Sequence, residues 1–283
     1  MAATSFVHVS DLHIGIHPAA DRAAAKLSET LLHRHLGPVL VTGDVTHRGR
    51  RDEFLRFQKL FAPLAEEGRL LIVPGNHDRL GDDLRDELMP GPRVQATRVG
   101  DLWVVRLDST GDHNRRWLES HGIVTDADIA AVVEALRAAP PDTQTVLLLH
   151  HHPMPLVHDH PMERLVTMLG WPNARELATG RLLLESIRGL CDAVLHGHRH
   201  LPAELLPWPA DQCHAPARSG GPQQSGGVQR PLRIFSAGSS TLQRTFRAFR
   251  SATTPACWVM LDEPSTNGEA AEVHGLAADA AGG

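Results

Sequence analysis

Short apolar runs recur along the chain, and several of them end in a polar loop. Runs of this length are typical of buried strands, and they lie at residues 5–9, 38–42, 69–73, 102–109, 143–149 and 191–196. Other segments repeat apolar residues with the period of a helix, at residues 21–36, 52–68, 125–139 and 173–190. Because strands and helices alternate, the pattern predicts an α/β fold in which helices flank a sheet.

The last part of the chain has a different pattern. Further strands are expected at residues 233–240, 256–263 and 271–276, without long helices between them. Residues 207–231 are rich in Pro, Gly, Gln and Ser, which predicts a flexible surface loop. We expect the tail 276–283 to be disordered. Since no repeat or linker divides the sequence, we expect one domain over residues 3–275.

Composition narrows the class of protein. The chain has 283 residues, of which 42% are hydrophobic and 22% charged, so it can bury a sizeable core. Its net charge of −5 argues against a protein that binds nucleic acid through a basic face. The three cysteines do not form a disulfide framework, and we see no signal peptide or membrane span. These features predict a cytoplasmic protein without a membrane partner.

The chain contains 19 histidines and no tyrosine, and many of the histidines follow predicted strands. Since the carboxyl ends of strands in open α/β sheets converge on one edge, we expect these polar groups to meet at one site. Five strand ends contribute to this set, through Asp11 and His13, Asp44, Asn76 and His77, His150–His152, and His198 and His200.

These residue types are suited to a pair of metal ions. Imidazoles bind Zn, Fe or Mn, and carboxylate and amide oxygens bind the harder ions. Asp11 and His13 are two residues apart, as are His198 and His200, so in an extended segment each pair points to one side. The two oxygens of Asp44 could bridge two ions. Neighbouring glycines at positions 43, 75 and 197 would let the backbone turn sharply there.

The order of these blocks, D-x-H, G-D, G-N-H-D, a histidine before a proline and G-H-x-H, resembles that of the calcineurin-like metallophosphoesterases. The resemblance spans residues 11–200, and the stretches HVSDLHIG and HHHPMP are most similar to the class III cyclic-nucleotide phosphodiesterase group. It implies a four-layer αββα sandwich of two mixed sheets, with the metal site at the C-terminal strand ends. It also implies two divalent or trivalent metal ions, either Mn, Fe or Zn.

The resemblance also implies a role for each residue of the site. It assigns Asp11, His13, Asp44 and His200 to the first metal, and Asp44, Asn76, His151 and His198 to the second. His151 stands two residues before the proline, as the family's ligand does, while His150 is the alternative. His77 is expected to face the substrate as a catalytic residue, with Asp78 behind it.

The function implied by the resemblance is hydrolysis of a small phosphodiester, with a cyclic nucleotide as the first candidate, by a hydroxide that bridges the metals. A nuclease, a phosphomonoesterase and a non-catalytic interaction scaffold are the alternatives. A nuclease would need a basic groove, and only residues 243–250 alternate arginine with phenylalanine. We expect those arginines to lie in solvent and Phe246 and Phe249 to be buried. His158 and His160 are candidates to line the substrate entrance.

Overall fold

The computed structural model describes residues 6–34, 36–155, 176–208, 231–250 and 257–260. Several sequence-based predictions concern residues outside this part of the chain. They are the strand at 271–276, the tail 276–283, positions 209–230 of the predicted loop, and His158 and His160.

The first sheet has five strands in the order β11-β10-β1-β2-β3. Its parallel part forms from three short apolar runs, and two later strands extend it in antiparallel orientation. The strands are β1 (Phe6–Val9), β2 (Val39–Thr42), β3 (Leu70–Val73), β10 (Thr245–Phe249) and β11 (Cys257–Met260). The predicted strand at 233–240 belongs to the other sheet, so the chain returns to the first sheet only at β10.

The second sheet has six strands in the order β4-β5-β6-β7-β9-β8. Its four central strands are parallel, and an antiparallel strand closes each edge. The strands are β4 (Val94–Val99), β5 (Leu102–Leu107), β6 (Gln144–Leu148), β7 (Ala193–His196), β8 (Pro202–Leu205) and β9 (Arg233–Ala237). The two edge strands were not expected from the sequence.

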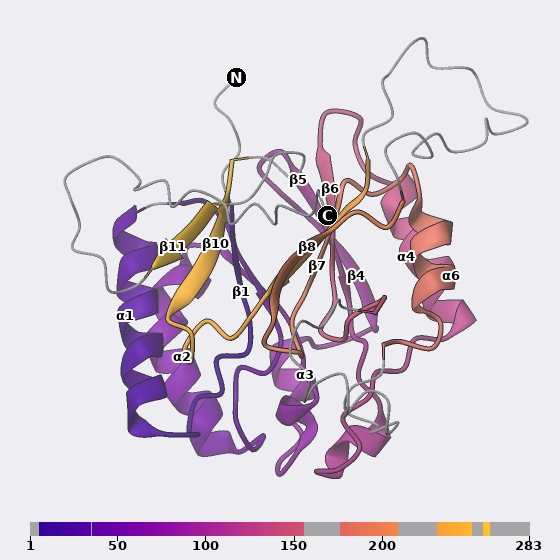
Figure 1. The fold of residues 1–283 in the computed structure, drawn as a ribbon. Helices are drawn as coiled ribbons and strands as arrows, with labels where there is room; N and C mark the ends of the chain where they lie inside the picture. The colour runs from indigo at the N-terminus through magenta and orange to yellow at the C-terminus, as the bar shows by residue number, and fades with distance from the viewer. Residues whose placement is uncertain (1–5, 35, 156–175, 209–230, 251–256, 261–283) are drawn as a thin grey trace, which may run out of the picture.

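Helices cover the outer face of each sheet, as Figure 1 shows. On the first sheet lie α1 (Pro18–Arg34) and α2 (Arg51–Glu66), and on the second lie α4 (Asp126–Arg137) and α6 (Gly180–Ile187). The Thr125 side chain caps α4 by accepting the amide of Asp128. A short helix, α3 (Arg85–Leu88), and two 3-10 turns, η1 (His77–Arg79) and η2 (Asp112–Arg115), lie between the longer elements. None of the helices that the structure describes is long and apolar enough to cross a membrane.

Three separate apolar layers hold this arrangement together, and strand periodicity explains them. In β1, Val7 and Val9 pack with the helices of the first sheet, while Phe6 packs between the two sheets. In β7, Val194 faces α4 and α6, while Leu195 joins the layer between the sheets. Because both faces of these strands are covered, they appear in sequence as continuous apolar runs. The predicted αββα sandwich is confirmed.

The arginine-rich segment differs from its prediction in one respect. Phe246 and Phe249 of β10 are buried as expected, but Arg247 is also buried. Adjacent residues of a strand point to opposite faces, so the burial of both Phe246 and Arg247 shows that β10 is covered on both faces there. Arg247 donates to the main-chain oxygen of Ala203 at 2.7 Å, and its guanidinium lies 5.5 Å from the ring centre of Phe235. The prediction that all of these arginines lie in solvent is therefore wrong.

Candidate metal centre

The polar strand ends meet between the two sheets, as the topology predicts. The loops after β1 and β2 are joined by hydrogen bonds from the Asp11 amide to Gly43 O (3.1 Å) and from the His13 amide to Asp44 O (2.9 Å). The Gly197 amide after β7 donates to His150 O after β6 at 3.1 Å. The His198 amide then reaches the Asp11 carboxylate at 3.2 Å, which links the second sheet to the first.

Most of the candidate ligands have a strained backbone. Seven non-glycine residues have a positive φ in the part of the chain that the structure describes, and five of them are candidate ligands. These five are Asp11, His13, Asp44, His198 and His200, with φ between 45° and 73°. Side chains make this conformation unfavourable by about 1–2 kcal/mol, so it persists only where neighbouring contacts impose it. The concentration of strain here is typical of a functional site.

The first cluster consists of Asp11, His13 and His200. The Nε2 atoms of the two imidazoles are 2.9 Å apart, and His200 Nε2 lies 3.3 Å from Asp11 Oδ1. Nitrogen ligands that bind one ion at about 2.1 Å with tetrahedral or octahedral angles lie about 3.0–3.4 Å apart. The distances that involve His200 are close to this range, while His13 Nε2 lies 4.0 Å from Asp11 Oδ1, and together the three residues could hold one metal ion.

The second cluster gathers around the amide oxygen of Asn76. His150 Nε2 and His198 Nδ1 each lie 3.0 Å from Asn76 Oδ1. His150 Nε2 is also 3.4 Å from Asp44 Oδ2, and that same oxygen lies 3.9 Å from His13 Nε2 in the first cluster. Asp44 thus stands between the two clusters.

His150 takes the place that the sequence assigned to His151. Both ring nitrogens of His151 already have partners outside the cluster, Ser109 Oγ and the main-chain oxygen of Ser120, each at 2.9 Å. The ring of His150 is held at Nδ1 by Thr42 O at 2.7 Å, which points Nε2 toward Asn76. We therefore replace His151 with His150 in the candidate ligand set.

The electrostatics of the site suit a cation. Burial lowers the pKa of His13 to about 3 and that of His198 well below the usual value, so both rings are neutral and able to bind a metal. Burial disfavours ionised Asp44, but His150 and His77 hold the pKa of that carboxyl well below its usual range. For His150, the carboxylates of Asp44 and Asp11 overcome burial and raise its pKa to about 9. The two carboxylates thus create a negative potential that positive charge would offset.

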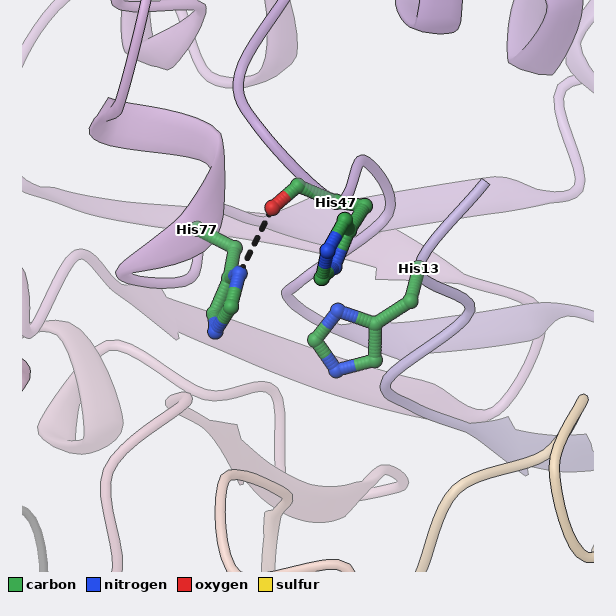
Figure 2. Close-up of side chains that lie close together, drawn as sticks. All are labelled: His13, His47 and His77. Carbon is green, nitrogen blue, oxygen red and sulfur yellow. Dashed lines mark hydrogen bonds between the residues drawn. The ribbon is translucent and has the colours of Figure 1, made fainter. Parts of the chain in front are cut away.

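His77 lies at the edge of this centre and has an unexpected partner. Its Nδ1 contacts the main-chain oxygen of His47 (Figure 2), and the two atoms are 2.7 Å apart. Its amide donates to Asp44 Oδ1 at 2.8 Å, which ties the backbone of His77 to the carboxylate between the two clusters. Because a carbonyl oxygen only accepts, Nδ1 must carry the hydrogen, and a neutral His77 has its lone pair on Nε2.

Asp78 does not stand behind His77, as the sequence-based interpretation proposed. Its carboxylate accepts the amides of Thr46 and Gly75, each at 2.9 Å, and the hydroxyl of Thr46 at 2.7 Å. Burial, and next the Asp44 charge, raise the pKa of Asp78 to about 6. Asp78 therefore joins the loops that carry Asp44 and Asn76, and its catalytic role stays a prediction.

Two glycines allow the ligand loops to approach each other closely. A Cβ atom at Gly75 would overlap the carboxylate and the main-chain nitrogen of Asp44. A Cβ atom at Gly197 would overlap Ser10 Oγ and the carboxylate of Asp11. Glycine is needed at both positions because of this close contact rather than because of its backbone angles.

Several supporting residues were missed by the sequence interpretation. Ser239 Oγ donates to Asp11 O and Thr241 Oγ1 donates to Leu12 O, both at 2.8 Å. Ser109 Oγ accepts the amides of His150 and His151 at 3.3 and 3.2 Å. Polar residues directly after the strands at 102–107 and 233–237 were the available signal, because these strands end at the same edge as the ligand strands.

A pocket of about 260 Å³ opens onto the centre. Its inner wall contains Asp44, Asn76, His77, His198 and His200. Its outer wall comes from a segment between β5 and α4, which contributes Asn114, Arg116, Trp117 and Ser120. A small ester could therefore reach the candidate ligands from solvent.

Comparison with protein families gives one match over most of the chain. The model of the family described as Calcineurin-like phosphoesterase matches residues 4–202. A probable cyclic nucleotide phosphodiesterase of Rhodococcus erythropolis is 27% identical over 204 residues, which cover 62% of this chain and 64% of the relative. A cAMP/cGMP dual specificity phosphodiesterase of Mycobacterium tuberculosis is 29% identical over 213 residues, 69% of this chain and 61% of the relative. The match thus spans less than two thirds of either relative.

Solved structures share the fold at low sequence identity. A dimetal phosphatase from Danio rerio aligns with a TM-score of 0.59 and 10% identity, covering 88% of this chain and 92% of that one. A purple acid phosphatase from yellow lupin aligns with a TM-score of 0.59 and 13% identity, covering 87% of this chain and 48% of that one. At these identities the likeness concerns the fold alone.

Proposed function

Because the chain belongs to the calcineurin-like phosphoesterase family, we propose that it is a metal-dependent hydrolase of small phosphodiesters, with 3′,5′-cyclic nucleotides as the leading substrates. The names of the Rhodococcus and Mycobacterium relatives support this substrate class. The pocket supports it too, since its volume of about 260 Å³ suits a small ester rather than a folded polymer.

One observation carries the proposal: the Asp44 carboxylate lies between two sets of donor atoms that could each hold a metal ion. We assign Asp11, His13, Asp44 and His200 to the first ion, and Asp44, Asn76, His150 and His198 to the second. Two metal ions held by these residues would supply a water-derived nucleophile and offset charge on the phosphoryl oxygens. The identity of the metals, whether Mn, Fe or Zn, is left to measurement.

In this proposal His77 acts on the substrate and does not bind a metal. The His47 carbonyl fixes the hydrogen on Nδ1, so Nε2 is the atom that can exchange a proton with the leaving oxygen. The hydrogen bond from the His77 amide to Asp44 keeps this ring next to the metal centre. The ester oxygen that departs would therefore lie on the His77 side of the pocket.

The alternatives are less well supported. A nuclease needs a continuous basic strip, but Arg247 is buried between the exposed Arg244 and Arg250. A phosphomonoesterase would use the same donor atoms, and only assays separate it from a diesterase. A non-catalytic scaffold would have no need for a complete set of donor atoms in two clusters.

The test is to measure metal content and activity together. Protein reconstituted with Mn²⁺, Fe²⁺ or Zn²⁺ is assayed on 3′,5′-cyclic nucleotides, single-stranded DNA and a phosphomonoester. We expect two metal ions per chain and hydrolysis of the cyclic nucleotides. Hydrolysis of DNA alone would favour the nuclease, and metal binding without hydrolysis of any of these substrates would favour the scaffold.

A further inference from the structure

Trp117 is a large aromatic residue held in an unusual position. Its side chain lines the pocket over the candidate metal centre, yet the residue is 55% exposed. Its ring centre lies 5.3 Å from that of His77 and 5.7 Å from that of His47, with interplanar angles of 76° and 85°. The indole is therefore stacked on neither imidazole, and much of its apolar surface remains open to the pocket.

The segment that carries Trp117 is a compact loop with ordered ends. The Ile123 amide donates to Ser109 O at 2.9 Å and closes the loop at its base. Within the loop, the buried Asn114 donates from its side chain to Glu119 O at 2.6 Å and to His121 O at 3.0 Å. Such a closed loop holds its side chains in place by its own contacts. The exposure of Trp117 is therefore imposed by the loop.

The loop is also fastened to the side of the site that carries His77. Arg79, two residues after His77, donates to Thr110 Oγ1 at 3.1 Å and to Asp112 Oδ1 at 3.0 Å. Asp108 Oδ1 accepts the Thr110 amide at 2.9 Å and so supports this same end of the loop. The position of Trp117 over the pocket is thus tied to the position of His77.

We propose that Trp117 is a specificity residue whose indole stacks on the heteroaromatic base of a nucleotide ester bound at the metal centre, a proposal that rests on the proposed function. Aromatic side chains bind bases in this way because every base has a π face. A ring at the edge of the pocket, beside His77, places the base at the mouth and the phosphate at the metals. An ester without a base would lack this contact.

The proposal is tested by binding of two matched ligands to the Mn²⁺-loaded protein. Adenosine 5′-monophosphate and ribose 5-phosphate share the phosphate and the sugar, and only the first has a base. Isothermal titration calorimetry on the wild type is expected to show that the base improves affinity about tenfold, which corresponds to about 1.4 kcal/mol. W117A should reduce this advantage to less than about twofold, and W117F should restore part of it.

The neighbouring residue provides a matched control. Leu118 is 70% exposed but does not line the pocket, so L118A should keep the wild-type preference for the nucleotide. Three outcomes would overturn the proposal: no preference for the base in the wild type, an unchanged preference in W117A, or an equal loss of affinity for both ligands. The last of these would mean that Trp117 supports the phosphate site and does not contact a base.

Turnover is measured separately, so the two proposals can fail independently. If W117A lowers the binding preference as expected while the wild type hydrolyses no ester, then the proposed activity fails and the base contact stands. If the wild type hydrolyses cyclic nucleotides with an unchanged preference in W117A, then the activity stands and the role of Trp117 fails.

Discussion

His77 Nδ1 lies 2.7 Å from the main-chain oxygen of His47, a contact that fixes which ring nitrogen of His77 can reach a substrate (Figure 2). The contact uses the backbone of His47, so the side chain at position 47 can change without removing it. This allows the role of His77 to be tested with an unusually direct control.

We expect His77→Ala to keep both metal ions while it slows hydrolysis of an alkyl or ribose ester by about 10²–10⁴-fold, the usual contribution of a general acid. Hydrolysis of a nitrophenyl diester should slow less in this variant, because its leaving group needs little protonation. His47→Ala keeps the carbonyl and should retain most activity. Rates on both esters and metal content by mass spectrometry provide the check. Equal losses on the two esters would instead indicate that His77 stabilises charge on the phosphoryl oxygens.

Asp44→Asn should lower the metal content below two ions per chain and reduce diester hydrolysis by at least about 10²-fold. The reason is that a neutral amide offers one oxygen where the carboxylate offers two, and it removes a negative charge from a buried site. Metal analysis and activity on the same preparation test this. Full activity with one ion per chain would contradict the two-metal assignment.

His150→Gln and His151→Gln form a pair that separates a ligand from a supporting residue. His150→Gln should lose metal from the second cluster, because His150 Nε2 faces Asn76 and Asp44. His151→Gln should keep the metal stoichiometry and lower the melting temperature, because His151 is bonded to Ser109 and Ser120. Stoichiometric metal binding by His150→Gln, with loss in His151→Gln, would restore the assignment made from sequence.

Gly75→Ala should impair the site through sterics alone. The added methyl group would overlap Asp44, and overpacking of this kind typically costs about 1–3 kcal/mol. Gly68→Ala is the matched control, because nothing lies within 4 Å of a Cβ there, although its positive φ of 67° adds some backbone strain. Denaturant titration and metal content together measure the effect. A Gly75→Ala protein with normal metal content and stability would show that the loops can separate freely.

Much of the fold follows from the sequence because most strands are covered on both faces. Runs such as the one in β7 contain no polar residue before the strand end, and so the ligands that follow stand out. The edge strands β4 and β8 are partly exposed, and their mixed pattern does not distinguish them from loops. Arg247 was misplaced for a related reason, since its burial depends on the neighbours of β10 and not on its own segment.

The sequence predicts most of the candidate ligands, but it does not predict which of the three consecutive histidines is a ligand or which groups orient the rings. Spacing identifies the pairs Asp11 and His13, and His198 and His200, because the two members of each pair are two residues apart and closely follow a buried strand. Three consecutive histidines at 150–152 give no such guide. The choice between them depends on the turn after β6 and on partners such as Thr42 O and Ser120 O, which lie far away in sequence. The contact of His77 with the His47 carbonyl could not be predicted either, because every residue has a backbone carbonyl and the sequence of side chains does not show which one is used.

The hydrogen bonds from Ser239 and Thr241 to the Asp11 loop have a consequence for how the protein matures. They join residues 228 and 229 positions apart, so the ligand loop after β1 is supported by the loop after β9, which is synthesised much later. At about 5–20 residues per second, translation would leave Asp11 and His13 without this support for roughly 10–50 s. We expect chains released before residue 238 to bind metal weakly, which can be measured on stalled nascent chains. The geometry of the centre would thereby delay tight metal capture until residues 239–241 have been synthesised.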